Sequence, residues 1–426
     1  MKTYRTRALA TLVASTVMAG TGLAQAPSAS AAPASPGRYI IQTTSAAATA
    51  EQVAELRDSG SPIEARYSRV LTGFAGELSA RQVRELRADA SVTSVTRDLR
   101  ISIDDTRVSR AQSNVSQPTV AQPTALAQAA APWGLDRIDQ RGVTGDGLFH
   151  YDTTGKGVTA FVIDSGIRIS HTQFGGRASH GYDFVDKDTN ASDCANGTGH
   201  GTHVAGTLGG STYGVAKEVK LVSLRVFDCK GDADLSDVIS ALEWAVAHKP
   251  VGGAVINFSG GGPEDALAEA AFARTIRAGI SVVVAAGNEN IDACDDSPAG
   301  VPAALTVAAS DANDREAAFS SDGSCVDLFA PGVNITSAGI ASNTATAAMS
   351  GTSMATPHVA GAVAQYLQQH PKASPGQVSA TIVQRATRNK LKLADPSPNR
   401  LLYTSNTYVP TSVRVVRRAA PPATRP

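Results

Sequence analysis

The sequence predicts an α/β fold with a mainly parallel sheet for the larger part of this 426-residue chain. Apolar runs rich in β-branched residues, which are typical of buried parallel strands, occur at residues 158–163, 220–225, 253–257, 280–285 and 326–329. Helical apolar spacing occurs at residues 235–248 and 266–278. Strands that alternate with helices in this way form a parallel sheet covered by helices. The length leaves room for two or three domains.

The first 31 residues have the pattern of a secretory signal peptide. Lys2, Arg5 and Arg7 precede an apolar stretch at residues 8–23, and the small-residue sequence 29–31 follows it. The apolar stretch is too short and too rich in small residues for a membrane span, and no other segment approaches the required length of about 18 residues. We therefore expect a secreted, extracellular protein with no membrane attachment.

A small α+β unit is predicted at residues 37–104. Strand patterns at 38–42, 70–78 and 92–96 alternate with helix patterns at 46–59 and 79–87, and Ser79 stands where it would cap the second helix. A ferredoxin-like β-α-β-β-α-β unit is the natural assembly of these elements. Residues 105–131 follow as a linker rich in Ala, Gln, Ser and Pro, which has little to form a core and is a place for processing.

The net charge of zero hides an uneven distribution. Residues 1–131 hold 14 of the 38 basic and 10 of the 38 acidic side chains, and residues 404–426 hold four arginines and no acid. This leaves 20 basic and 28 acidic side chains for residues 132–403, an acidic balance that argues against nucleic-acid binding. The basic, proline-containing tail at 404–426 is expected to be disordered or removed.

A serine in the sequence Gly-Thr-Ser-Met-Ala-Thr-Pro, Ser353, stands where a helix is predicted to begin. A backbone N–H in the first turn of a helix has no intrahelical acceptor, so it is free to meet an oxyanion, and the helix dipole favours negative charge there. Ser353 therefore fits a catalytic nucleophile. The same pattern also fits an ordinary helix cap.

Two further motifs carry an acid and a base. Asp164 ends the apolar run 158–163, where open α/β sheets gather catalytic groups, although a turn aspartate is the common alternative. An aspartic protease would need a second copy of the Asp-Ser-Gly motif, and none is found. His200 stands three residues before His203, so a metal pair is conceivable, but a zincin requires a glutamate between its two histidines. The small residues around His200 instead suit a helix start packed closely against neighbouring elements, and His200 fits a catalytic base better than a metal ligand.

Taken together, the motifs resemble those of the subtilisin-like serine proteases, in which the triad has the order Asp164, His200, Ser353. The resemblance is strongest to the proteinase K branch and its aqualysin-like enzymes, and it extends to residues 131–140, 213–217, 327–332 and 398–403. It implies a three-layer subtilisin-like catalytic domain at 132–403. It also implies that residues 37–104, which match at 67–79, are an inhibitor-type propeptide that acts as an intramolecular chaperone and inhibitor.

The implied activity is that of a secreted serine endopeptidase of broad specificity, made as a self-processing zymogen and acting as a monomer on protein and peptide substrates. In this interpretation Ser353 attacks the scissile carbonyl, His200 takes its proton, and Asp164 holds the imidazole. Asn288, which follows the strand pattern 280–285, corresponds to the family's oxyanion asparagine, although asparagine is also a common turn residue.

The resemblance also implies that substrate binds as a strand between two segments. One contains Gly231, Asp232 and Ala233, and the other contains Ser259, Gly260 and Gly261. In the second segment the family's usual leucine is missing or replaced, which puts the wall between subsites in doubt and predicts a roomier or more flexible groove. Asp232 and Asp234 suggest a mild preference for basic residues upstream of the cut.

Structural calcium is the expected cofactor, and no organic cofactor is expected. The resemblance implies a first site from the carbonyls of Pro302 and Ala304 with the Asp327 carboxylate. It implies a second site made of oxygen ligands, as Ca²⁺ prefers, from Asp136, Asp139, Gln140 and Asp146.

Four cysteines fit an oxidising compartment and allow three pairings. The resemblance implies that Cys194 pairs with Cys229 and Cys294 with Cys325. Two other classes of function remain as alternatives: a non-catalytic binding protein of the same fold, and a metallohydrolase that uses His200 and His203.

Overall fold

The computed structural model describes residues 36–103, 127–194, 197–394 and 397–404, which all belong to one compact unit. Three sequence predictions fall outside these residues: the signal peptide, the linker up to residue 126, and the tail beyond residue 404. Across the described ranges, none of the helices has both the length and the hydropathy needed to cross a membrane.

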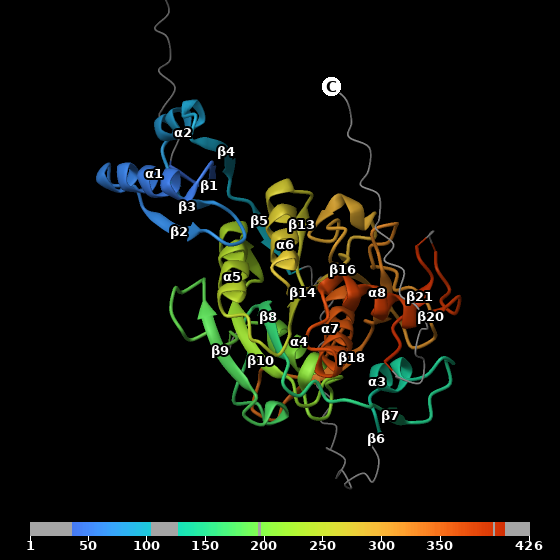
Figure 1. Cartoon of the computed structure of the whole chain (residues 1–426). Coiled ribbons are helices and arrows are strands. Elements are labelled where there is room, and N and C mark those ends of the chain that lie inside the picture. The colour runs from blue at the N-terminus through green and yellow to red at the C-terminus, as the bar shows by residue number, and fades with distance from the viewer. Residues whose placement is uncertain (1–35, 104–126, 195–196, 395–396, 405–426) are drawn as a thin grey trace, which may run out of the picture. The chain divides into compact units, whose positions relative to one another are not determined.

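The N-terminal part is an antiparallel sheet of four strands, in the order β2-β3-β1-β4, accompanied by two helices (Figure 1). Its elements are β1 (Gly37–Thr43), α1 (Ala46–Asp58), β2 (Ile63–Tyr67), β3 (Gly73–Leu78), α2 (Ala80–Ala88) and β4 (Val92–Arg97). This is the predicted β-α-β-β-α-β order. The prediction that Ser79 caps α2 is confirmed, because its side chain and that of Gln82 form a reciprocal capping box.

One strand of this domain differs from its predicted extent. The sequence predicts a strand at residues 70–78, whereas β3 begins at Gly73 and residues 68–72 form the turn that joins it to β2. The Glu243 carboxylate of the larger domain accepts hydrogen bonds from the backbone N–H groups of residues 68, 69 and 70, each at 2.9 Å. A distant side chain therefore holds this turn, and a local sequence pattern does not reveal it.

The larger domain is built on a nine-stranded, mainly parallel sheet in the order β20-β21-β17-β16-β14-β12-β8-β10-β9. These strands are β8 (Thr159–Asp164), β9 (Ala178–Asp183), β10 (Lys220–Arg225), β12 (Ala254–Phe258), β14 (Ser281–Ala285), β16 (Leu305–Ser310), β17 (Leu328–Pro331), β20 (Thr387–Arg388) and β21 (Arg400–Leu401). The five predicted strands are all present, with ends shifted by up to two residues. The sequence analysis did not identify β9 and β16.

Helices cover both faces of this sheet, which gives the three layers that the resemblance implies (Figure 1). They are α3 (Trp133–Ile138), α4 (His200–Gly209), α5 (Leu235–Ala247), α6 (Ala266–Arg277), α7 (Thr352–Gln369) and α8 (Pro375–Arg385). Alternate residues of β8 face opposite ways: Ala160 and Val162 share a core with α4 and α7, and Phe161 and Ile163 share another with α5 and α6.

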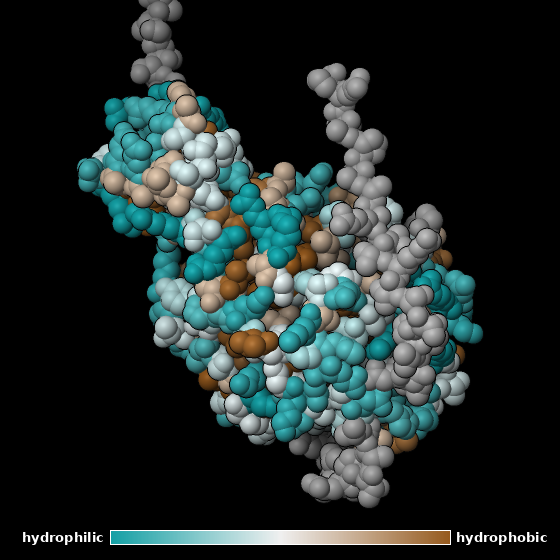
Figure 2. All heavy atoms as spheres, viewed as in Figure 1, coloured by the Kyte–Doolittle hydropathy of each residue, from teal (hydrophilic) through white to brown (hydrophobic). Residues whose placement is uncertain are grey.

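Short elements complete the domain. They are β6 (Ala127–Ala129), β7 (Leu148–His150), β11 (Asp232–Asp234), β13 (Gly262–Pro263), β15 (Asp296–Ser297), β18 (Ile335–Ala338), β19 (Thr346–Met349), and the 3₁₀ turns η1 (Thr172–Phe174) and η2 (Ala293–Asp295). Disulfides join Cys194 to Cys229 and Cys294 to Cys325, the pairing that the resemblance implies. On the face drawn in Figure 2, apolar side chains are scattered among hydrophilic ones.

The two domains share a buried apolar contact. Ile40, Tyr67, Val70, Leu71 and Ala75 of the N-terminal domain lie in the same core cluster as the buried faces of α5 and α6. The Tyr67 hydroxyl also donates a 2.9 Å hydrogen bond to a backbone oxygen of α5. The sheet of the N-terminal domain therefore packs against the helices of the larger one.

Candidate active site

Asp164 and His200 meet at the carboxyl end of the parallel sheet. Asp164 is the last residue of β8, His200 is the first residue of α4, and both side chains are fully buried. His200 Nδ1 lies 2.7 Å from Asp164 Oδ1, and because an ionised carboxylate only accepts, this contact places the imidazole proton on Nδ1. In this tautomer Nε2 carries no proton and can accept one.

The close approach of α4 to this strand end depends on glycine. A Cβ at Gly201 would lie 2.2 Å from the Gly166 carbonyl oxygen and 3.0 Å from Asp164 Oδ1. No other residue fits there without moving His200 away from Asp164. The small residues around His200 therefore serve the close packing that the sequence analysis inferred.

His203 does not join His200 in a metal pair. Its Nε2 lies 2.8 Å from the Ile335 carbonyl oxygen of β18, so this ring nitrogen is engaged by the backbone. Burial lowers the pKa of His203 to about 3, so the ring stays neutral. Among the described residues no group of three or more His, Cys, Asp or Glu side chains is placed to hold a metal ion, which leaves the metallohydrolase alternative without support.

Ser353 is the second residue of α7 and is 2% exposed. Its hydroxyl donates to the Ser259 carbonyl oxygen at 3.4 Å. Pro357 in the same helix has no N–H to donate to the Ser353 carbonyl, and the Ser259 hydroxyl donates to that carbonyl instead, at 3.1 Å. Ser259 thus compensates for the proline and ties the start of α7 to the segment after β12.

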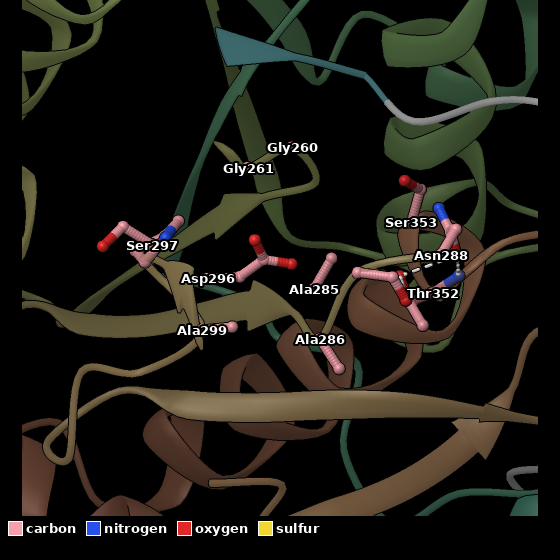
Figure 3. Close-up of a pocket in the computed structure, with 12 residues that line it drawn as sticks. Gly260, Gly261, Ala285, Ala286, Asn288, Asp296, Ser297, Ala299, Thr352 and Ser353 are labelled. Atoms are coloured by element: carbon pink, nitrogen blue, oxygen red, sulfur yellow. Dashed lines mark hydrogen bonds between the residues drawn. The ribbon is translucent and has the colours of Figure 1, made fainter. Parts of the chain in front are cut away.

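Asn288 follows β14 and is held by the first residue of α7. Its Oδ1 accepts from the Thr352 N–H at 2.8 Å and from the Thr352 hydroxyl at 3.0 Å. With the oxygen held in this way, the amide nitrogen lies on the side of Ser353 in Figure 3. The geometry offers two donors to a carbonyl oxygen above Ser353: this amide and the Ser353 backbone N–H in the first turn.

The two segments that the sequence analysis proposed for substrate binding enclose a strand of the chain itself. This strand, β5 (Arg100–Ser102), pairs antiparallel with β11, so that Asp232 faces Ser102 and Asp234 faces Arg100. On its other side Ser102 and Gly261 exchange two backbone hydrogen bonds of 3.1 Å each. The Ile103 N–H donates to the Gly231 carbonyl at 2.9 Å.

The side chains of β5 occupy distinct environments. Ile101 and Leu99 pack against the apolar cluster of α5, α6 and β12, and together they line a small pocket there with Leu235, Val238, Phe258, Ala268 and Phe272. Arg100 forms ion pairs with Asp232 at 3.4 Å and with Asp234 at 3.1 Å. This is the contact that the predicted preference for upstream basic residues requires.

The groove is not roomier at Gly260, contrary to the sequence-based prediction. A Cβ at Gly260 would lie 2.5 Å from the Phe227 ring, which packs on Phe258. An aromatic side chain from the segment after β10 therefore fills the space next to the glycine. The two positions are 33 residues apart in the chain, so the compensation is invisible at the motif itself.

A pocket opens beside Ser353 (Figure 3). It is lined by Gly260, Gly261, Ala285, Ala286, Gly287, Asn288, Asp296, Ser297, Pro298, Ala299, Thr352 and Ser353. The sequence analysis missed Asp296 as a member of this site. The one signal available was a pair of acids before a proline in a loop, which local pattern alone does not connect to the pocket.

The residues proposed for calcium lie in two places. Asp136 Oδ1 accepts from the Gln140 amide at 2.5 Å and from the Asp146 N–H at 3.2 Å, so these three residues are gathered in one loop. Asp139 turns its Oδ2 to His150, while its Oδ1 is buried without a hydrogen-bond partner. At the other place, Asp327 Oδ2 accepts from the Thr306 N–H, two residues beyond Ala304.

Comparison with known proteins gives the class of the chain. It matches the subtilase family over residues 155–402 and the peptidase inhibitor I9 family over residues 31–104. It is 46% identical over 346 residues to the extracellular serine proteinase of Thermus sp. (strain Rt41A), with 81% of this chain and 78% of that protein covered. The chain belongs to the subtilase family.

Two further comparisons agree. The chain is 44% identical over 341 residues to alkaline serine exoprotease A of Vibrio alginolyticus, which covers 80% of this chain and 60% of that protein. The crystal structure of a cold-adapted subtilisin-like serine proteinase superposes with a TM-score of 0.62 at 47% identity, over 65% of this chain and 99% of that one. This protein is a subtilisin-like serine endopeptidase with an N-terminal inhibitor domain.

The hold of Thr352 on Asn288 leads to a prediction. Thr352→Val removes the hydroxyl that donates to Asn288 Oδ1 but keeps the backbone bond, so kcat on a peptide substrate should fall about five- to tenfold with KM nearly unchanged. Steady-state kinetics measure this. Thr356→Val is the matched control, since its hydroxyl bonds only to a carbonyl within α7. Equal losses in the two variants would contradict a positioning role for Thr352.

Proposed function

We propose that the chain is a secreted zymogen of a broad-specificity serine endopeptidase, in which Asp164, His200 and Ser353 form the triad and Asn288 contributes to the oxyanion hole. The observation that carries the proposal is strand β5. It lies between β11 and Gly261 as an extended substrate would, and it leads toward Ser353. A non-catalytic binding protein of this fold would not need the His200–Asp164 contact or the held Asn288.

In this mechanism Ser353 Oγ attacks the scissile carbonyl while His200 Nε2 accepts the hydroxyl proton. The imidazolium that forms is stabilised by Asp164, which remains ionised. The Asn288 amide and the Ser353 N–H donate to the developing oxyanion, and such a donor contributes about 3–4 kcal/mol, a magnitude that was itself measured on subtilisin. His200 then returns the proton to the leaving amine.

Main-chain recognition supports broad specificity. The bonds between β5 and its two neighbours join backbone atoms, which every residue type provides. Selectivity then rests on the pockets that receive side chains, such as the apolar pocket around Ile101. Protein and peptide substrates in extended conformation are the class that fits.

The register of β5 supports a place for the first cut. Ser102 is level with Gly261, two residues after Ser259, and the Ser353 hydroxyl donates to the Ser259 carbonyl. We propose that processing follows residue 104, at the boundary between the inhibitor domain (37–104) and the linker (105–131). Residue 104 itself lies outside the described residues.

The central test compares the wild type with Ser353→Ala. The wild type should lose its propeptide and take up one fluorophosphonate label, while the variant should stay at the full length left after signal removal and remain unlabelled, as measured by intact mass. Normal maturation and labelling of the variant would show that Ser353 is not the nucleophile. Treatment with a chelator distinguishes the proposed serine protease from the metallohydrolase alternative, because a chelator would abolish the activity of a metallohydrolase at once.

We also propose structural calcium at the loop that contains Asp136, Asp139, Gln140 and Asp146, and at the carbonyls of Pro302 and Ala304 with Asp327. Asp139 Oδ1 is buried without a hydrogen-bond partner among the described residues, and Asp136, Gln140 and Asp146 carry oxygen atoms of the kind that a hard cation prefers. The Asp136 and Asp146 carboxylates accept from the Gln140 amide nitrogen and are not gathered as a three-acid group, so bound calcium would displace that nitrogen. Bound there, calcium would neutralise neighbouring carboxylates and hold the loop between α3 and β7.

Chelation should therefore lower the thermal midpoint of the mature enzyme, followed by circular dichroism, and leave its initial rate at low temperature unchanged. Asp136→Asn should reduce the difference between midpoints with and without calcium. An immediate loss of activity on chelation, without a change in midpoint, would contradict a structural role.

Acid groups crowd the contact between the two domains and support an inhibitory role that depends on pH. Arg38 of the inhibitor domain pairs with Glu64 and Asp98 of its own domain and with Asp234 and Asp237 of the catalytic domain. The pKa of Asp237 is raised to about 7, chiefly by burial; Arg38 lowers it, and the carboxylates of Asp234, Asp98 and Glu64 raise it. Burial also raises the pKa of Asp98. Departure of the inhibitor domain would expose Asp237 to water and lower its pKa.

The bound state therefore holds more protons than the separated domains between the ordinary carboxyl range and about pH 7. Binding of the cleaved inhibitor domain should weaken as pH rises through this window, by up to about tenfold per pH unit for one proton. The lag before activity appears, normalised to the final rate at each pH, measures release. Asp237→Asn should flatten the dependence, and an unchanged slope in that variant would count against the assignment.

A further inference from the structure

The pocket beside Ser353 contains one ionisable side chain, Asp296. Its other lining residues are glycine, alanine, proline, serine, threonine and asparagine. Figure 3 shows the Asp296 carboxylate facing the space between Ala285 and the segment of Gly260 and Gly261. The proposed mechanism assigns no role to Asp296, so the presence of a carboxylate in this pocket is not explained by the mechanism.

The pocket lies where a substrate side chain must go. Ser353 and Asn288, which would hold the scissile carbonyl from two sides, both line it, and so does Thr352. Gly261, which pairs with the strand in the groove, forms its rim. The residue that carries the scissile carbonyl therefore directs its side chain into this pocket.

The Asp296 carboxylate has no hydrogen-bond donor and no ion-pair partner anywhere in the described parts of the chain. Two buried acids elsewhere are paired with arginine: Asp314 with Arg137 at 2.7 Å, and Asp183 with Arg225 at 2.6 Å. The backbone of Asp296 is fixed by pairing with β13 and by the Gly300 N–H. The backbone of Asp296 is therefore fixed, and its carboxylate can bind a cationic side chain of a substrate.

A second acid strengthens the field at this pocket. A Cβ at Gly287 would lie 2.9 Å from Asp296 Oδ2 and 3.1 Å from Glu289 Oε2, so the two carboxylates flank the same glycine. The absence of a side chain at Gly287 leaves room for both. A cationic group that enters the pocket would therefore meet one partly buried carboxylate and the edge of another.

We propose that Asp296 is a specificity-determining residue that selects lysine or arginine immediately before the scissile bond. This inference rests on the proposed function and narrows its broad specificity at this one position of the substrate. A basic side chain gains an ion pair in a partly desolvated pocket, while an acidic one meets like charge. The expected preference for lysine over a neutral residue of similar length is about ten- to a hundredfold in kcat/KM.

The preference depends on the ionisation of Asp296. Burial raises the pKa of Asp296 to about 6, with smaller contributions from Glu289 and Asp295. Glu269 of α6, which accepts from the Ser297 hydroxyl, is the other acid that faces this loop, and burial raises its pKa as well. The carboxylate is charged above about pH 6, so the preference for lysine is present there and fades as the pH falls below that value.

The processing site is a separate case. The bond proposed for the first cut follows an acid, Asp104. Cleavage within one chain gains from the high effective concentration of a tethered strand, which offsets an unfavourable side chain. The preference therefore has to be measured on separate substrates.

The experiment uses the mature enzyme and four peptides that differ only in the residue before the scissile bond: Lys, Arg, Met or Glu. The wild type at pH 8 should cleave the Lys and Arg peptides at least tenfold better than the Met peptide, with the Glu peptide cleaved least. The ratio of Lys to Met should approach one at pH 5.

Two variants complete the design. Asp296→Asn should reduce the ratio of Lys to Met at pH 8 at least tenfold and remove its pH dependence, while fluorophosphonate labelling shows that the site is intact. Asp295→Asn, which changes the exposed neighbouring acid outside the pocket, should keep the ratio within about twofold.

The outcomes separate the two proposals. Equal kcat/KM for the Lys and Met peptides in the wild type at pH 8, or an unchanged ratio in Asp296→Asn, would overturn the inference alone. If Asp296→Asn does not fold, the pH profile of the wild-type ratio still decides. A wild type that cleaves none of the peptides and takes no label would instead overturn the proposed function.

Discussion

The site depends on the burial of α7. Almost every residue of this helix from Thr352 to Leu367 is buried, and it packs against the same face of the sheet as α4. Burial on this scale fixes the helix along its length and so fixes the position of its first turn. Because parallel strands all present their carboxyl ends at one edge, that first turn meets the ends of β8, β12 and β14 together. Asp164, Ser259 and Asn288 come from those three strand ends.

The motif-bearing residues could be predicted because each stands at a junction that the sequence marks. Asp164 ends an apolar strand, His200 and Ser353 begin helices, and Asn288 follows a strand. The spacing of apolar residues changes where a strand or helix begins or ends, so a polar residue at such a point can be recognised in the sequence. The same reasoning predicted most of the helices and strands that surround the site.

The residues that were not predicted make contacts with segments that are distant in the sequence. Glu243 holds a turn of the other domain, Phe227 fills the space at Gly260, and Asp296 reaches a pocket formed largely by other segments. In each case the local sequence is an unremarkable helix face or loop. The information lies in the tertiary contact, and a pattern of spacing within one segment does not encode it. Two consequences follow: the expected roomier groove was wrong, and the acid in the pocket was missed.

The inhibitor domain and a substrate use the same backbone contacts but different side-chain contacts. Strand β5 binds as any extended peptide would, while Glu243, Tyr67 and Arg38 add interactions that only this domain provides. Affinity for the inhibitor domain can therefore be tuned without altering recognition of substrates. The crowding of carboxylates around Arg38 makes this extra part of the contact the one that responds to pH.

Several of the acidic side chains that give residues 132–403 their negative balance lie along the proposed substrate groove. Asp232 and Asp234 already pair with Arg100 of β5 in the groove, and Asp296 lies further along the same path, beside Ser353. An extended peptide with basic residues would thus pass acids at both ends of the groove. The groove acids are engaged by the inhibitor strand, whereas Asp296 has no partner among the described residues. The inhibitor strand therefore pairs with the outer acids, and the proposed discrimination among substrates rests on Asp296.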